Sequence, residues 1–162
     1  KSAIESFCFF YQKSQAFDVT ILRPVTIYGV RPALDKSEWF QTIDYLATNY
    51  NVEVKGSTKY VSVDAVTQAI DLCMDNKEAS GKIYHLVDGH IHNLDLANII
   101  VETVDSFGEV EGVKGEDGVP LSNEAARKLG VEFKGLEGIK EYIKLVHQLQ
   151  TQYGGDRLIQ KW

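Results

Sequence analysis

The sequence of 162 residues has little positive charge, few cysteines and no long apolar run. Its 17 Lys and Arg are outnumbered by 23 Asp and Glu, which gives a net charge of −6 at pH 7. A surface with this charge does not attract phosphates, and no stripe of Lys and Arg is interleaved with aromatic residues. The composition therefore excludes nucleic acid as an expected partner.

Apolar runs are short throughout the chain. The longest of them, such as residues 3–11, fall far below the roughly 20 residues that a membrane-spanning helix needs. We expect neither a membrane-spanning segment nor a signal peptide, and no membrane as a partner. The two cysteines, Cys8 and Cys73, fall in segments with helical periodicity, where a free thiol commonly packs as a small apolar side chain. The sequence predicts a reduced, cytoplasmic protein without disulfides.

What the sequence does contain is an alternation of helical and strand patterns. Apolar residues recur at three- and four-residue spacing in six segments, which predicts helices over residues 1–15, 37–50, 64–80, 93–104, 123–129 and 136–150. Ser37, Asp64 and Asn93 are the expected N-caps of three of them. β-branched or alternating runs predict strands over residues 18–22, 51–55, 59–63 and 83–87, with Gly56 and Ser57 separating the second from the third. Residues 25–36 are expected to form a loop. This order is typical of an α/β protein with parallel strands.

The expected sheet is small, and the first helical pattern is unusually apolar. Only residues 18–22 and 83–87 have the pattern of buried strands. The first helical pattern begins at Lys1 itself, without an initiator methionine, and residues 7–11 make it apolar on several sides. We therefore expect a piece of a larger α/β protein, or a chain that takes strands from a partner. The first helix should pack both on the sheet and on another helix.

Short motifs follow one another along residues 1–105. Lys1 is followed by Glu5 four residues later, the first strand pattern is followed by Leu-Arg-Pro at residues 22–24, and Tyr28 precedes a glycine. Further on come Tyr-Val-Ser-Val-Asp at residues 60–64, Lys-Ile-Tyr-His-Leu at residues 82–86, and Asn93 before a leucine. In this order and at this spacing, the motifs resemble the extended short-chain dehydrogenase/reductase family, the NAD(P)-dependent epimerases, dehydratases and reductases.

The resemblance implies the C-terminal part of a Rossmann-like doubly wound parallel sheet plus a small α+β substrate-binding region. Residues 1–105 would form the last helix–strand units of that sheet, with substrate-binding segments inserted at about residues 24–63. Residues 106–150 would complete the substrate-binding region, and residues 151–162 would be a tail. The parent protein would carry about 150 further N-terminal residues, including the glycine-rich turn that binds the pyrophosphate of the cofactor.

The resemblance also assigns roles to single residues. In the family, a tyrosine acts as general acid/base, and a lysine four residues later lowers its pKa and holds the ribose of the cofactor. Lys1 stands in the position of that lysine and is the expected catalytic residue, with its tyrosine upstream of the sequence. Lys1, Pro24, Val25 and Ile27 would contact NAD or NADP, with residues 24–27 running past the nicotinamide.

Three further residues, Thr26, Tyr28 and Thr58, are expected to contact a small-molecule substrate. Thr26 replaces the asparagine often found in sugar-nucleotide members of the family. Thr58 stands where many of those members have an arginine, which can hold a diphosphate with two parallel hydrogen bonds. These departures disfavour a nucleotide-sugar substrate, and residues 63–66 resemble the thioester- and acyl-reductase branch at least as much, so both branches stay open.

A glycine triplet could be mistaken for a dinucleotide-binding loop. Gly112, Gly115 and Gly118 have a regular spacing of three residues. A pyrophosphate loop, however, follows a buried strand and opens a helix. Here Glu116 and Asp117 would repel phosphate from inside the loop, and a proline follows where the helix should start. We therefore expect an acidic surface loop.

Three histidines, His85, His90 and His92, crowd around one expected turn together with Asp88. Alternation along a strand and a turn would point their side chains to different sides, and no cysteine lies nearby. We therefore expect no metal site, and read them as scattered polar residues at the end of a strand.

We expect the C-terminal, substrate-binding half of an NAD(P)-dependent epimerase, dehydratase or reductase, which transfers hydride at a carbonyl or carbinol carbon. The isolated chain should be inactive, because it lacks a pyrophosphate-binding turn. In the resembling family the first helix helps to form a dimer interface, so a homodimer is expected. The alternative is a non-catalytic domain of the same architecture that binds a ligand or another protein, since fold alone does not give activity.

Overall fold

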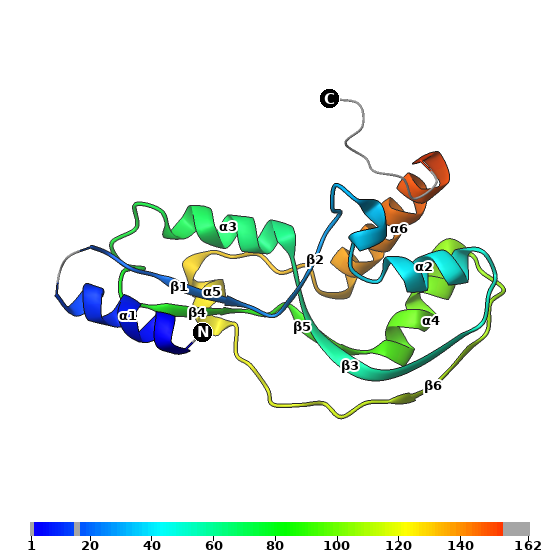
Figure 1. The fold of residues 1–162 in the computed structure, drawn as a ribbon, viewed down its shortest axis with the longest axis horizontal. Helices are drawn as coiled ribbons and strands as arrows, with labels where there is room; N and C mark the ends of the chain where they lie inside the picture. Colours follow the sequence, from blue (N-terminus) through cyan, green and yellow to red (C-terminus); the bar gives the residue numbers. More distant parts are fainter. Residues whose placement is uncertain (1, 15–16, 154–162) are drawn as a thin grey trace.

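The computed structural model describes residues 2–14 and 17–153. The helices are α1 (Ser2–Lys13), the 3₁₀ helix η1 (Leu34–Lys36), α2 (Phe40–Ala47), α3 (Val63–Cys73), α4 (Asn93–Val104), α5 (Glu124–Leu129) and α6 (Gly135–Tyr153). The strands are β1 (Ile21–Pro24), β2 (Thr26–Tyr28), β3 (Val52–Ser62), β4 (Ile83–Leu86), β5 (Gly89–His92) and β6 (Val110–Lys114). The molecule is elongated, with α1 and α3 at one end and α2, α4 and β6 at the other (Figure 1).

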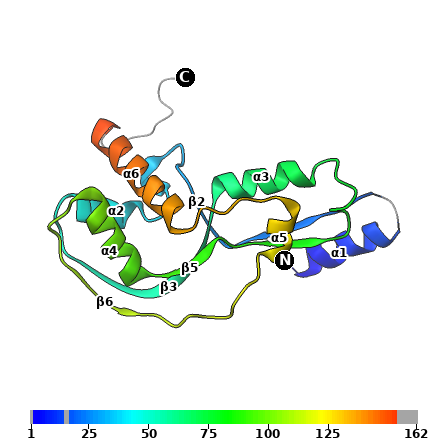
Figure 2. The same cartoon turned by 180° about the vertical axis from the view of Figure 1, so that it is seen from behind.

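At one end, β1 and β4 form a parallel pair in which Arg23 lies opposite His85. Figures 1 and 2 show α1 and α3 on opposite sides of this pair, which is the layered arrangement that the sequence predicts. One apolar cluster, which we name the first core, lies here. Its buried members are Val61, Ala65, Ala69, Ala79, Tyr84, Leu86, Ala126 and Val131.

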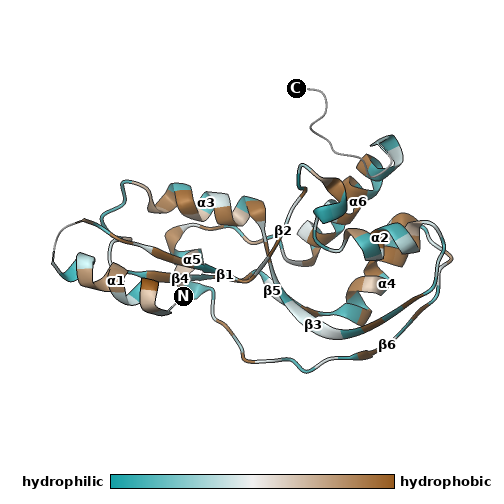
Figure 3. Ribbon diagram, in the orientation of Figure 1, coloured by the Kyte–Doolittle hydropathy of each residue, from teal (hydrophilic) through white to brown (hydrophobic). Residues whose placement is uncertain are grey.

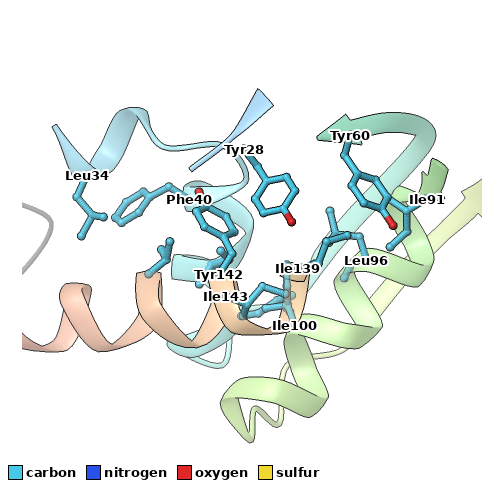
Figure 4. Packing of buried hydrophobic residues seen from close by; sticks show 14 residues of the cluster. Tyr28, Leu34, Phe40, Tyr60, Ile91, Leu96, Ile100, Ile139, Tyr142 and Ile143 are labelled. Carbon is cyan, nitrogen blue, oxygen red and sulfur yellow. The ribbon is translucent and has the colours of Figure 1, made fainter. Parts of the chain in front are cut away.

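At the other end, β3 is the centre of a second sheet. It runs parallel to β2 and β6 and antiparallel to β5. A second apolar cluster, the second core, lies between this sheet and helices α2, α4 and α6, and Figure 4 shows part of it from close by. Its members include Tyr28, Leu34, Phe40, Ile43, Leu46, Tyr60, Ile91, Leu96, Ile100, Ile139, Tyr142, Ile143 and Val146. Two cores therefore share one chain.

Three strands of this second sheet were not predicted, and one predicted break is absent. β2, β5 and β6 fall in segments that the sequence indicated as loops or turns. The two expected strands at residues 51–55 and 59–63 are one continuous strand, β3. Gly56, which was expected to separate them, has a φ of +86°, so the strand continues through a conformation that favours glycine.

The predicted N-caps were wrong by one or two residues in each case. Ser37 is buried and accepts a hydrogen bond from the Arg31 N–H at 3.0 Å, three residues before α2 begins. Ser62, not Asp64, caps α3 by accepting the Ala65 N–H at 3.1 Å. The side chain of Asn93 donates to the Lys55 carbonyl at 2.8 Å instead of capping α4. Polar residues near a helix start were identified, but their partners depend on the tertiary fold.

Helix α1 is exposed, against the expectation that it is packed on two sides. None of its residues is buried, and Ile4, Phe7 and Phe10 are 68%, 62% and 65% exposed. Figure 3 shows its apolar residues at one end of the molecule. Cys8 on this helix and Cys73 on α3 are free thiols. Within residues 2–14 and 17–153, no helix is both long enough and apolar enough to span a membrane.

Candidate functional site at the carboxyl ends of β1 and β4

The carboxyl ends of β1 and β4 lie side by side, and the chain leaves both strands in the same region. Pro24 lies opposite Leu86, and the Val25 N–H donates to the Leu86 carbonyl at 3.2 Å. From there, one segment continues into β2 and the other into β5, both of which join β3. Ligands of open parallel sheets bind outside the carboxyl ends of the strands, so this junction is the candidate site.

An ion pair ties α1 to the end of β1. Arg23 Nε donates to Glu5 Oε1 at 2.9 Å, and its Nη2 donates to the second carboxylate oxygen. The hydrogen bond and charge of Arg23 hold the pKa of Glu5 below its ordinary value of 4.5. The start of α1 is therefore held against the candidate site. Lys1, the expected catalytic residue, lies outside the described residues.

The predicted contact residues from the end of β1 into β2 face different surroundings. Pro24 is exposed and Val25 packs against the first core. Thr26 and Ile27 pair with Tyr60 and Val61 of β3, which leaves Thr26 half-buried and Ile27 37% exposed. These four residues lie at the junction, and their contacts with cofactor or substrate stay a prediction.

Tyr28 is turned into the second core. Its ring is 3% exposed and packs 5.5 Å from the ring of Trp39 and 5.2 Å from that of Tyr142, centroid to centroid. Figure 4 shows the ring among apolar side chains. Burial raises the pKa of the Tyr28 phenol well above its ordinary value. The ring of Tyr28 therefore packs in the second core, and its expected contact with a substrate stays a prediction.

Thr58 borders a cavity of about 390 Å³ on the second sheet. It lies on β3 opposite Ile91 of β5. The other walls come from β3, from α2 with the two residues before it, and from the start of α4. They are Glu38, Trp39, Thr42, Glu53, Val54, Lys55, Asn93 and Leu96. A flat indole beside two hydroxyls and an amide gives this cavity both an apolar surface and hydrogen-bonding groups.

Asp88 has a structural role that the sequence did not reveal. It lies two residues after the end of β4, and its two carboxylate oxygens accept the Gly135 N–H at 2.9 and 3.1 Å. Its own N–H donates to the Tyr60 carbonyl at 2.8 Å. Gly135 begins α6, so the carboxylate lies at a helix N-terminus, where a negative charge is stabilised. Partial burial nevertheless raises the pKa of Asp88. The only sequence signal was an Asp-Gly pair after a strand.

Two of the three histidines lie together, which corrects the expectation that they point to different sides. His90 and His92 are two residues apart on β5, so their side chains share one face of the strand. The reason for the error is that residues 89–92 form a strand and not a turn. Asp117 lies beside them, with an oxygen 3.1 Å from His92 Nε2.

Of the glycine triplet, Gly112 lies in strand β6, and Gly115 and Gly118 lie in the segment that follows it. Gly112 pairs with Val54 of β3, so residues 110–114 are a strand where an acidic loop was expected. A Cβ at Gly112 would lie 2.0 Å from the Val54 carbonyl oxygen, which explains the glycine by close approach of two backbones. The next helix, α5, begins only at Glu124. The triplet therefore does not open a helix.

Solved structures with a similar fold include several nucleotide-sugar enzymes. A UDP-glucose 4-epimerase from Thermotoga maritima with UDP-glucose is 20% identical, has a TM-score of 0.74, and matches over 94% of this chain and 52% of its own. A UDP-glucose 4-epimerase from Thermus thermophilus with NAD is 19% identical, has a TM-score of 0.70, and matches over 91% of this chain and 51% of its own. A dTDP-glucose 4,6-dehydratase from Streptomyces venezuelae with NAD is 17% identical, has a TM-score of 0.65, and matches over 90% of this chain and 49% of its own. No protein-family model and no curated protein matches the sequence.

The chain has the fold of half a nucleotide-sugar epimerase. It spans about half the length of the epimerases that it matches. The epimerase fold confirms the predicted class, an α/β protein with a Rossmann-like parallel sheet, and agrees with a C-terminal segment. In this fold, the junction lies outside the carboxyl ends of the parallel strands β1 and β4, which is a common ligand position.

Proposed function

We propose that this chain is the C-terminal, substrate-binding half of an NAD(P)-dependent epimerase, dehydratase or reductase. The observation that carries the proposal is the match of more than nine-tenths of the chain to epimerases of twice its length. The motifs at residues 22–24, 60–64 and 82–86 add independent support, because they fall on β1, on the β3–α3 connection and on β4. The reaction would be hydride transfer at a carbonyl or carbinol carbon.

The residues at the junction suit the nicotinamide side of a dinucleotide better than its phosphates. Pro24 and Ile27 offer exposed apolar surface at the carboxyl edge, with Val25 between them, and Lys1 would hold the ribose. The glycine triplet offers no turn from a buried strand into a helix for the pyrophosphate. When bound, NAD or NADP would supply the hydride acceptor and donor. This chain would orient the nicotinamide, and an N-terminal half would anchor the phosphates.

The substrate would enter the cavity beside Thr58. Matched structures hold UDP-glucose, UDP-glucuronic acid and NAD, so a sugar nucleotide is the substrate class that the fold favours. Trp39 could stack on a base, while Thr58 and Thr42 could bind hydroxyls. Glu38 and Glu53 in the same lining disfavour phosphate oxygens there. The absence of an arginine at position 58 leaves an acyl or thioester substrate as the competing choice.

A calorimetric titration with NADH and NADPH tests the cofactor assignment. We expect no tight binding to the 162-residue chain and clear binding to a longer protein that adds the N-terminal half, with Lys1→Met weakening it. Micromolar binding to the chain alone would contradict the division of the site between two halves.

Thermal shift measurements with UDP-glucose and with an acyl thioester test the substrate cavity in the longer protein. Thr58→Val should reduce the shift given by the true substrate class, whereas Thr67→Val, on the exposed side of α3, should not. Equal effects of the two variants would remove Thr58 from the site.

We also propose that the exposed apolar side of α1 forms a homodimer contact. Phe7, Phe10 and Tyr11 line a shallow depression on this helix, and apolar patches of this kind commonly mark interfaces. Light scattering of the longer protein should give a dimer, and Phe7→Asp should give a monomer. A monomer without the substitution would contradict this assignment.

A further inference from the structure

Three metal-ligating side chains from two distant segments meet on the outer side of β5. His90 and His92 come from the strand itself, and Asp117 comes from the segment after β6. An Asp117 carboxylate oxygen lies 3.1 Å from His92 Nε2 and 4.0 Å from His90 Nδ1. One ligand atom from each of the three residues lies within 4.8 Å of the other two. They are close enough to share one ion.

The backbone around this cluster is held in place from both sides. Ser57 of β3, which pairs with His92, donates its hydroxyl to the Glu116 carbonyl at 2.7 Å. Lys114, at the end of β6, donates to Asp95 in the first turn of α4 at 2.9 Å. Asp117 is therefore fixed near β5 by its neighbours in sequence, and its own side chain is free to act as a ligand.

The two imidazoles are mostly buried, with side chains 25% and 18% exposed, while Asp117 is 85% exposed. His92 Nδ1 is buried and has no hydrogen-bond partner among the described residues. At 3.1 Å, His92 Nε2 and the Asp117 oxygen would oppose two lone pairs unless a proton or a cation lies between them. A cation would satisfy both groups and also engage His90.

We propose that His90, His92 and Asp117 bind a divalent zinc ion, with water as the fourth ligand. Zinc takes imidazole nitrogen and carboxylate oxygen in tetrahedral sites, and a site with three protein ligands keeps one position open. The exposure of Asp117 provides the path by which the ion enters. The site does not depend on the function proposed above, because it uses none of the residues assigned to cofactor or substrate.

A substitution of Lys59 distinguishes a cation site from an anion site. It pairs with His90 across β3 and β5, and its Nζ lies 3.0 Å from where a Cβ of Gly118 would be. Its positive charge repels a cation at the site and would attract an anion. Lys59→Met should therefore strengthen the binding of zinc, whereas it would weaken the binding of phosphate if the cluster were an anion site.

The test is a calorimetric titration of the full-length protein, free of any histidine tag, with zinc chloride and separately with inorganic phosphate. We expect one zinc ion per chain and tetrahedral absorption bands when cobalt replaces zinc. Loss of a residue that only hydrogen-bonds to a metal ligand costs about 10–100-fold in metal affinity, so loss of a ligand itself, in Asp117→Asn or His92→Asn, should cost at least about tenfold. His85→Asn, on β4, is the matched control and should leave the affinity unchanged.

Asp117 is exposed, so Asp117→Asn should fold normally, and thermal unfolding of each apo variant checks this. Zinc binding that survives both ligand substitutions, or no stoichiometric binding, would overturn the proposal. So would phosphate binding that Lys59→Met weakens, because that outcome identifies an anion site.

Discussion

Arg23, at the end of β1, holds Glu5 of α1 through two of its guanidinium nitrogens. The two residues are 18 positions apart, and no residue of α1 is buried. Gln12, near the other end of the helix, bonds the Val19 N–H at 2.6 Å and the Ser80 hydroxyl at 2.8 Å. Polar contacts at both ends therefore attach α1, and burial of its apolar side does not.

Glu5→Gln should weaken this attachment and change its dependence on pH. Because the pKa of Glu5 is lowered in the folded chain, its stabilising effect is present above the ordinary value of 4.5 and is lost as pH falls through the folded-state pKa. Melting temperatures measured from pH 7 down to about pH 3 should show a smaller acid-induced decrease in the variant. Glu102→Gln, at an exposed position of α4, is the control and should keep the original profile. An unchanged profile in Glu5→Gln would contradict the role of the pair.

Two neighbouring positions of α6 should respond differently to truncation. Ile143 is fully buried in the second core, and Leu145 is 45% exposed. Ile143→Ala removes buried methyl groups and leaves a cavity, so it should lower the free energy of unfolding by about 2–5 kcal/mol. Leu145→Ala should change it by no more than about 0.5 kcal/mol. Urea denaturation measures both, and similar losses would mean that the outer side of α6 is covered.

Gly112→Ala should disturb the pairing of β6 with β3. The new Cβ would lie 2.0 Å from the Val54 carbonyl oxygen, and backbone atoms cannot move aside as a flexible side chain can. Overpacking of this kind costs about 1–3 kcal/mol in unfolding free energy. Val113→Ala, at a position 74% exposed on the same strand, should cost little. Hydrogen exchange of residues 110–114 would show whether the strand has detached, and full protection in Gly112→Ala would refute the clash.

Two buried tyrosines that touch each other should differ when each loses its hydroxyl. Tyr142 donates to the Glu38 carbonyl at 2.6 Å, whereas the Tyr28 hydroxyl has no partner among the described residues. Tyr142→Phe should lower the unfolding free energy by about 0.5–1.5 kcal/mol. Tyr28→Phe should leave it unchanged or raise it, since an unpaired buried hydroxyl is removed. Thermal and urea unfolding compare them, and a loss in Tyr28→Phe equal to that in Tyr142→Phe would show that its hydroxyl is bonded.

The sequence predicted the helices well because each has an apolar side that repeats at the helical period, as in α4 and α6. It missed β2, β5 and β6, which are only three to five residues long and owe their conformation to pairing with β3. Gly56 was expected to end a strand, but its backbone conformation lets one pass through. Local sequence patterns do not predict pairings between strands that are far apart in the chain.

In the candidate site, too, local motifs were predicted correctly and contacts between distant segments were not. The Leu-Arg-Pro motif located the carboxyl end of β1 correctly, because proline is confined to strand ends and edges. The proximity of His90 and His92 depends on residues 89–92 being a strand, and Asp117 reaches them from 25 residues beyond His92 in the chain. The roles of Thr26, Thr58 and Lys1 remain predictions.

Tyr60 and Val61 are consecutive in β3, yet Tyr60 belongs to the second core and Val61 to the first. Side chains of adjacent strand residues point to opposite faces, so this one strand serves both clusters. β3 also passes into α3 without an intervening loop residue. Unfolding of either core would free β3 and so remove packing contacts from the other core. The two ends of the molecule should therefore lose their structure in one cooperative transition, with equal calorimetric and van't Hoff enthalpies.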